Sequence, residues 1–139
     1  IAEMINLRPP CFLDLQQVAE NHTVYEYTIF FDDEQARRLL YPVLKNVSYT
    51  RWHPYFMDIV PEGLSKSYGA ARILERIGVT REECMAFGDG GNDIPIIEYA
   101  GIGVAMGNAT DDVKAAADYV TDTVDEDGIV TALQHFGVL

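Results

Sequence analysis

The spacing of hydrophobic residues divides the chain into two parts with different patterns. In the first 60 residues, runs of β-branched and aromatic side chains, typical of strands, flank one stretch with apolar residues at helical spacing. His53-Pro54 marks a turn between the last two runs. The predicted elements are a strand at 24–31, a helix over 36–43, and strands at 47–51 and 55–60. This order indicates an α+β layer with antiparallel pairing.

From Pro61 onward, short apolar runs alternate regularly with helical patterns. The predicted elements are a helix over 70–77 closed by Gly78, strands at 84–87, 102–105 and 119–121, and helices around 94–97, 113–117 and 129–136. Strands that alternate with helices in this way form βαβ units and a parallel sheet. The predicted fold class is therefore α/β.

Composition and charge narrow the class of protein. The 139 residues, 48% of them hydrophobic, suffice for a domain with a core, and no apolar run reaches the length of a membrane span. With no signal-peptide pattern and no metal-type cysteine spacing, we expect a cytoplasmic protein with two free thiols, Cys11 and Cys84. The net charge of −12 repels phosphate backbones, so nucleic acid is not an expected partner, and neither is a membrane.

A small polar loop, Gly88–Asp93, follows the predicted strand at 84–87, at the strand end where parallel sheets bind ligands. Asp89 and Asp93 repel each other unless a cation lies nearby, and Mg²⁺, which takes few protein carboxylates, fits this loop. Asn92 offers an amide N–H to a phosphate oxygen or a neighbouring carboxylate, and the two glycines between the acids permit a sharp turn. The alternative is a capped turn in which Asp93 or Asn92 begins the helix and Asp89 is solvated.

Lys66 stands at the head of the predicted helix that precedes this loop. The helix dipole disfavours a cation at that end, so we interpret Lys66 as neutralising a phosphate or a carboxylate beside the metal. The alternative is a solvated surface lysine. Trp52, His53 and Tyr55 cluster in a turn that could face a substrate, although a structural turn is the preferred interpretation.

Several motifs in one order resemble the Cof-type phosphatase subfamily of the haloacid-dehalogenase-like hydrolases. The matching strings are Leu64-Ser65-Lys66, Phe87–Asp93, Ala100–Ala109, Val113-Lys114, Ala117–Thr121 and Glu126–Ile129. The resemblance is dense over residues 61–139 and loose over residues 1–60. It implies that residues 61–139 are the C-terminal part of a Rossmann-like core domain, and that residues 1–60 are the C-terminal part of an α/β cap domain.

The resemblance also implies an activity and a role for each candidate residue. Members of the subfamily are magnesium-dependent phosphatases that act on sugar phosphates and other small phosphorylated metabolites through an aspartyl-phosphate. Lys66 matches the lysine that holds the nucleophile and the phosphate, and Asp89 matches the carboxylate that binds Mg²⁺. Asn92 matches a phosphate contact, and Asp93 a catalytic-site carboxylate that supports the metal shell.

The chain departs from the family pattern in one respect that matters for activity. It contains neither a DxDGT-like string, which carries the nucleophile, nor the Ser/Thr phosphate-binding motif. We therefore expect the C-terminal part of an enzyme that is inactive alone, with an exposed core-sheet edge through which copies could self-associate. Two alternatives stay open: a non-catalytic phosphate- or metal-binding module, and a phosphomutase on the same fold.

Overall fold

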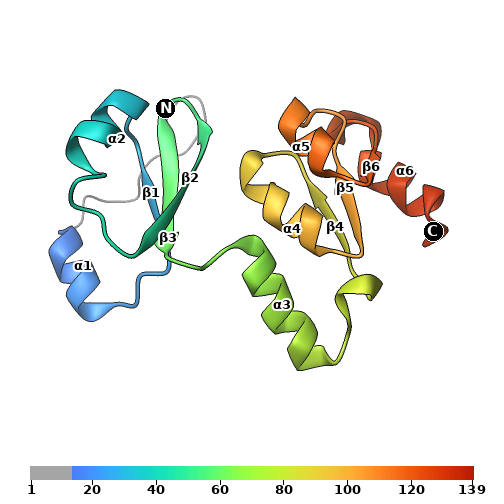
Figure 1. Ribbon diagram of the computed structural model, residues 1–139, viewed down its shortest axis with the longest axis horizontal. Coiled ribbons are helices and arrows are strands. Elements are labelled where there is room, and N and C mark those ends of the chain that lie inside the picture. Colours follow the sequence, from blue (N-terminus) through green and yellow to red (C-terminus); the bar gives the residue numbers. More distant parts are fainter. Residues whose placement is uncertain (1–13) are drawn as a thin grey trace.

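The computed structural model describes residues 14–139, without the side chain of Trp52, and contains two three-stranded sheets (Figure 1). The first has the order β1-β3-β2 and is antiparallel, and the second has the order β4-β5-β6 and is parallel. The predicted α/β class with a parallel core sheet is confirmed. No helix in the part of the chain that the structure describes is long and apolar enough to cross a membrane.

The antiparallel sheet and its helices occupy the first part of the chain. Its elements are α1 (Leu15–Asn21), β1 (Tyr27–Ile29), α2 (Asp33–Leu39), β2 (Val47–His53) and β3 (Phe56–Pro61). The predicted strands and their antiparallel pairing are present, although β1 is shorter than expected and α2 ends at Leu39. The sequence pattern missed α1, because this helix buries no residue and so has no apolar stripe.

A capping box starts α2, and the side of the helix that carries Ala36 packs against the sheet. The Asp32 carboxylate accepts from the Gln35 amide at 2.8 Å, while the Gln35 side chain accepts from the Asp32 amide at 3.2 Å. Ala36 is thereby buried against Met57 and Ile59 of β3. This small core holds β3 against α2, and because β3 directly follows the β2–β3 turn, it also helps to place that turn.

A β-bulge lies near the end of β2. The register is regular from Val47 to Thr50, which pairs with Asp58, and then shifts before His53 pairs with Phe56. Thr50 to His53 is three steps along β2, whereas Asp58 to Phe56 is two steps along β3. The extra residue on β2 bends the strand and increases its twist, which re-aims the turn that follows.

The parallel sheet begins after a long helix. The elements are α3 (Lys66–Ile77), β4 (Met85–Gly88), α4 (Ile94–Tyr99), β5 (Ile102–Ala105), α5 (Asp111–Ala116), β6 (Tyr119–Val120) and α6 (Gly128–His135), with short 3-10 turns at Arg81–Glu83, Gly91–Asp93 and Val124–Glu126. Each predicted strand and helix of this part is present. Ser65 caps the start of α3 through its hydroxyl, and Gly78 ends the helix at φ +73°, as predicted.

The core of the parallel sheet is formed by small and β-branched side chains. Ile97, Ala105, Ala109 and Val113 pack together between α4, β5 and α5. Among the described strands, β4 pairs only with β5, so its other side is an edge of the sheet. Cys84, just before β4, is a partly buried free thiol, and Cys11 lies outside the described residues.

Gly103 of β5 provides a test of this packing. A Cβ at this position would lie 2.3 Å from the backbone oxygen of Ile97, so Gly103→Ala forces α4 away from β5. We expect the variant to lose about 1–3 kcal/mol in the free energy of unfolding, measured by urea denaturation. The matched control is Gly69→Ala on α3, where a Cβ meets nothing within 4 Å, and which we expect to gain about 0.5–1 kcal/mol. Equal stabilities of the two variants would contradict this account.

Candidate functional site

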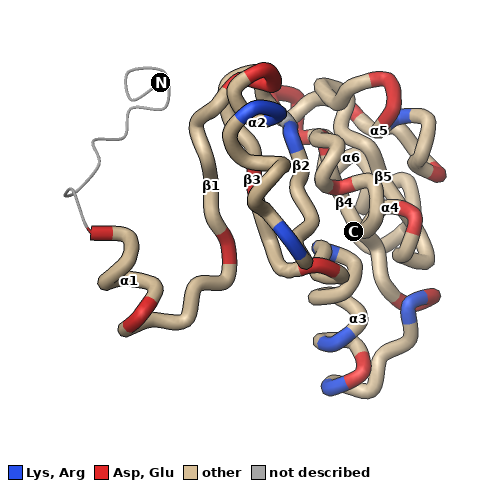
Figure 2. Tube along the Cα trace, turned by 60° about the vertical axis from the view of Figure 1, so that its left-hand side comes forward, with Lys and Arg blue, Asp and Glu red and all other residues tan. Residues whose placement is uncertain are grey.

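A cleft of about 710 Å³ lies between the β2–β3 turn and the carboxyl end of the parallel sheet. Its described lining residues are Arg51, His53, Pro54, Lys66, Asp89, Gly90, Gly91, Asn92, Asp93, Thr110 and Asp112. The structure thus brings together all four residues singled out in the sequence, which are Lys66, Asp89, Asn92 and Asp93. The sequence has 22 Asp and Glu against 10 Lys and Arg, and Figure 2 shows acidic residues in both parts of the described chain. The lining nevertheless contains two cations, Lys66 and Arg51.

Asp93 is the buried centre of this cleft, with 7% of its surface exposed. Its Oδ1 accepts from the Lys66 ammonium in an ion pair, and its Oδ2 accepts from the backbone amides of Asp89 at 3.0 Å and Gly90 at 3.1 Å. A Cβ on Gly88 would lie 2.4 Å from the Asp93 Cβ, so a glycine is needed at the end of β4 for the carboxylate to enter. These partners replace the water that burial removes from the carboxylate.

The electrostatics of the site keep Asp93 ionised. Burial raises the pKa of Asp93, but the hydrogen bonds from Lys66 and from the amides of Gly90 and Asp89 outweigh it, so the pKa lies below its ordinary value. The ionised carboxylate holds the Lys66 ammonium at the cleft, where half of the lysine side chain stays exposed. The repulsion that the sequence suggested between two loop carboxylates is therefore relieved, on the Asp93 side, by Lys66.

Asp89 is the more accessible carboxylate and is held by a residue from another loop. The Asn108 side chain donates from Nδ2 to the Asp89 Oδ2 at 3.1 Å, and its Oδ1 accepts from the Val124 amide at 3.2 Å. Asn108 thus ties the loop after β4 to the loop after β6. Sequence reasoning assigned no role to Asn108, although its place after β5, beside β4, was a signal that both loops share one edge of the sheet.

The loop around Asn92 differs in detail from the predicted one. Gly90 has φ −112° and Gly91 is not among the glycines with positive φ, so neither position uses the conformations reserved for glycine. Of the capped-turn alternative, Asp93 does occupy the N-cap position of α4 and Asp89 is exposed, but the Asp93 side chain makes no cap to α4 and accepts from the loop amides instead. Asn92 lies in the short 3-10 turn and lines the cleft.

The donor set allows one test of fit to Mg²⁺. No group of three or more His, Cys, Asp or Glu side chains that could hold a metal occurs among the described residues. Both Asp93 oxygens have protein partners, which leaves Asp89 and Asp112 as the carboxylates of the described lining that are able to face an ion, and of these Asp89 lies in the loop after β4. Mg²⁺ usually binds one or two carboxylates and completes its shell with water and phosphate oxygens, so this set fits part of a magnesium site.

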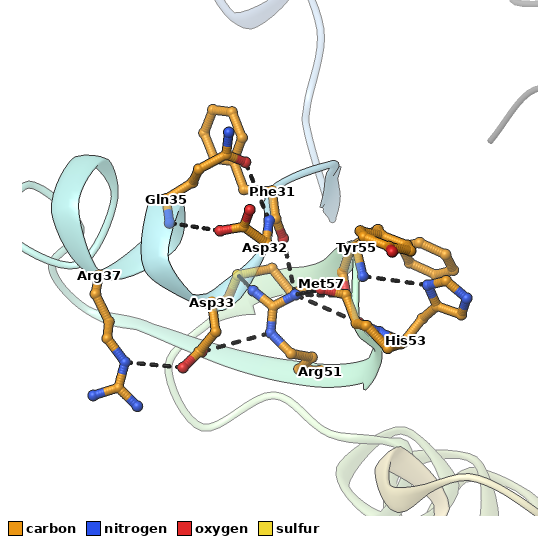
Figure 3. Close-up of polar contacts among 11 residues, drawn as sticks. Phe31, Asp32, Asp33, Gln35, Arg37, Arg51, His53, Tyr55 and Met57 are labelled. Atoms are coloured by element: carbon orange, nitrogen blue, oxygen red, sulfur yellow. Dashed lines mark hydrogen bonds and ion pairs between the residues drawn. The ribbon is translucent and has the colours of Figure 1, made fainter.

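The opposite side of the cleft is the β2–β3 turn, held by Arg51 (Figure 3). Its Nη1 donates to the backbone oxygen of Phe31 at 2.8 Å and of Pro54 at 3.1 Å, while its Nε lies 3.8 Å from an Asp33 oxygen. His53 also lines the cleft, which fits the weaker of the two sequence interpretations of this turn. Sequence reasoning missed Arg51, because most of its hydrogen bonds go to backbone oxygens, which leave no trace in the residue pattern.

Comparison with known proteins identifies the class of this chain. Residues 4–133 match the family model of the haloacid dehalogenase-like hydrolases, and the chain belongs to that family. The predicted resemblance is therefore confirmed at the level of the family and fold.

Individual relatives agree with this assignment. The chain is 41% identical over 123 residues to YcsE of Bacillus subtilis, named a 5-amino-6-(5-phospho-D-ribitylamino)uracil phosphatase, covering 84% of this chain and 49% of YcsE. It superposes with TM-score 0.89 and 43% identity on the phosphatase BT1666 of Bacteroides thetaiotaomicron, covering 99% of this chain and 51% of that one. It superposes on the sugar phosphatase BT4131 with TM-score 0.79 and 46% identity, covering 88% of this chain and 47% of that one. The chain thus spans about half the length of these relatives.

The lowered pKa of Asp93 predicts how stability depends on pH. Because the folded pKa lies below the unfolded value of about 3.9, the stabilising contribution of this carboxylate is fully present above that value. It is lost as the pH falls through the folded pKa. We expect Asp93→Asn to cost about 1–2 kcal/mol at pH 7, and this difference from the wild type to shrink at about pH 3, measured by urea unfolding.

The control for this experiment is Asp125→Asn, which changes an exposed acid in the loop before α6. It should leave the stability at both pH values within a few tenths of a kcal/mol of the wild type. A cost of Asp93→Asn that stays the same at both pH values would show that the ion pair with Lys66 does not set the stability of this loop.

Proposed function

We propose that this chain forms part of a magnesium-dependent phosphatase that hydrolyses small phosphorylated metabolites, with sugar phosphates as the substrate class. The observation that carries the proposal is the pairing of the Lys66 ammonium with the buried Asp93, next to the accessible Asp89 carboxylate in one cleft. Together these groups offer a cation for phosphate oxygens and an oxygen ligand for a hard metal ion.

The relatives support both the reaction and the substrate class. YcsE is named for a substrate with a phosphorylated ribityl chain, and BT4131 is described as a sugar phosphatase. Both organic groups are rich in hydroxyls. The cleft volume of about 710 Å³ accommodates a phosphate with a group of that size.

Each residue has a role in this proposal. Lys66 uses one ammonium hydrogen on Asp93 and has two more to donate to phosphate oxygens. Asp89 would hold Mg²⁺, which when bound would neutralise phosphate charge, and Asn108 would orient that carboxylate. Asn92, which lines the cleft, would donate an amide N–H to the phosphate. Asp93 would not contact the phosphate itself; its role would be to hold the Lys66 ammonium and the loop amides in position.

The bond-breaking step needs a group that these 139 residues do not contain. Hydrolysis through an aspartyl-phosphate requires a nucleophilic Asp, and the chain has no DxDGT-like string. We therefore expect the chain to bind inorganic phosphate in the presence of Mg²⁺ but not to turn over p-nitrophenyl phosphate. Turnover that is abolished by Asp89→Ala would contradict the account of the missing nucleophile.

Phosphate binding tests the role of Lys66. We expect Lys66→Ala to weaken the binding of inorganic phosphate, with Mg²⁺ present, by about tenfold or more, because a charge-assisted hydrogen bond is removed. Calorimetric or NMR titration measures the dissociation constant. Lys45→Ala, which removes an exposed lysine from the loop before β2, is the matched control and should leave the affinity unchanged. Equal phosphate affinities of the two variants would refute the proposed phosphate site.

Metal binding tests the link between Asn108 and Asp89. We expect Asn108→Ala to lower the affinity for Mg²⁺ alone by about tenfold, because residues that orient a ligand carboxylate have effects of this size. Asp89→Asn should lower it at least as much. Asn21→Ala on α1, the matched control, should have the affinity of the wild type. If Asn108→Ala binds Mg²⁺ as the wild type does, Asn108 does not position the ligand.

A further inference from the structure

The two sides of the cleft differ in chemistry. The side formed by the parallel sheet presents Lys66 and the carboxylates Asp89 and Asp112, which suit a phosphate and a metal ion. The side formed by the β2–β3 turn presents Arg51, His53 and Pro54. A phosphate ester bound at Lys66 therefore has the turn on its far side, where the organic part of the molecule would lie.

Arg51 has few donors left for a ligand. Its Nη1 donates to the backbone oxygens of Phe31 and Pro54, with longer contacts to those of His53 at 3.4 Å and Phe56 at 3.5 Å. Its Nη2 contacts the Met57 sulfur at 3.5 Å, and the side chain is 21% exposed. Figure 3 shows the guanidinium enclosed by the turn and by the chain before α2. Arg51 therefore fixes the shape of the turn.

Contacts within the turn orient the His53 ring, whose centroid also lies 5.6 Å from that of the Tyr55 ring. Its ring stacks on Phe56, with centroids 4.5 Å apart and planes at 14°, and its Nδ1 accepts from the Tyr55 amide at 3.3 Å. With Nδ1 occupied as an acceptor, the hydrogen of the neutral ring is on Nε2, on the side of the ring away from that amide. Pro54 has no side-chain donor. The Nε of Arg51 has no hydrogen-bond partner either, but it is buried, so His53 is the described turn residue of the cleft whose unused donor lies on a partly exposed ring.

We propose that His53 is a specificity-determining residue, which recognises the organic part of the substrate by donating from Nε2 to one of its oxygens. Arg51 is a positioning residue, which holds the bulged turn so that His53 faces the cleft. This inference rests on the proposed phosphatase function and makes it more specific. The chemical class is a phosphate ester with hydroxyl or ring oxygens several bonds from phosphorus, as in a sugar or polyol phosphate.

Binding to the full 139-residue chain with Mg²⁺ present tests the inference. The probes are inorganic phosphate, propyl phosphate, ribose 5-phosphate and glucose 6-phosphate, and the observable is each dissociation constant from NMR titration. We expect at least one of the two sugar phosphates to bind about 3–10-fold more tightly than propyl phosphate, the range of one hydrogen bond. In His53→Phe, which keeps the ring stack on Phe56 but lacks the donor, this preference should disappear while inorganic phosphate binds as before.

Two further variants separate recognition from folding. His53→Gln restores an N–H donor and should recover part of the preference for the sugar phosphate. His135→Phe, which changes a histidine stacked on Tyr119 in the last helix, is the matched control and should keep the full preference. Arg51→Lys should lose the preference with unchanged affinity for inorganic phosphate, and the Tyr55 amide resonance should shift because the turn is no longer held.

The outcomes distinguish this inference from the proposed function. If inorganic phosphate does not bind, or binds equally to Lys66→Ala, the proposed function fails and the inference fails with it. If phosphate binding depends on Lys66 but neither sugar phosphate is preferred over propyl phosphate, only the inference is overturned. A preference for the sugar phosphate that persists in His53→Phe also overturns the role of His53. If the Tyr55 amide resonance does not shift in Arg51→Lys, the positioning role of Arg51 is overturned.

Discussion

The buried carboxylate of Asp93 is the interaction on which the rest of the site depends. A charge with 7% of its surface exposed is stable only if the protein supplies the partners that water would. The partners are the Lys66 ammonium from the start of α3 and two amides of the loop after β4. Satisfying one charge therefore fixes a helix start and a loop relative to each other, at the carboxyl end of the sheet.

The carboxyl end of the sheet gains its second set of constraints from loops that are distant in sequence. Asn108 joins the loops after β4, β5 and β6 through the hydrogen bonds to Asp89 and Val124. Arg51, which lies within the bulge of β2, joins segments of the antiparallel part by donating to the backbone oxygens of Phe31, before α2, and of Pro54, in the β2–β3 turn. Asn108 and Arg51 hold neighbouring segments in place, while Lys66 and Asp89 are the charged groups that line the cleft. Each side of the cleft is thus held by hydrogen bonds between its own segments, and a few groups stay open to a ligand.

Much of the fold could be predicted because the local patterns agree with the tertiary arrangement. The alternation of strands and helices after Pro61 gave each element of the parallel sheet, and Gly78 ends α3 as expected. The failures are equally local. Helix α1 has no apolar stripe to detect, and the glycines at 90 and 91 do not adopt positive φ. The need for glycine at position 88, where a Cβ would collide with Asp93, had no signal in the sequence.

The sequence by itself determined the class of the protein and the residue types of the site, because the motif order and the placement of polar residues after buried strands are local properties of the chain. Only the tertiary structure decided which charges meet. It paired Lys66 with Asp93, brought Asn108 to Asp89, and placed the turn held by Arg51 across the cleft. These contacts join residues from separate elements, and their geometry depends on strand register, a bulge and loop packing, which no local pattern encodes.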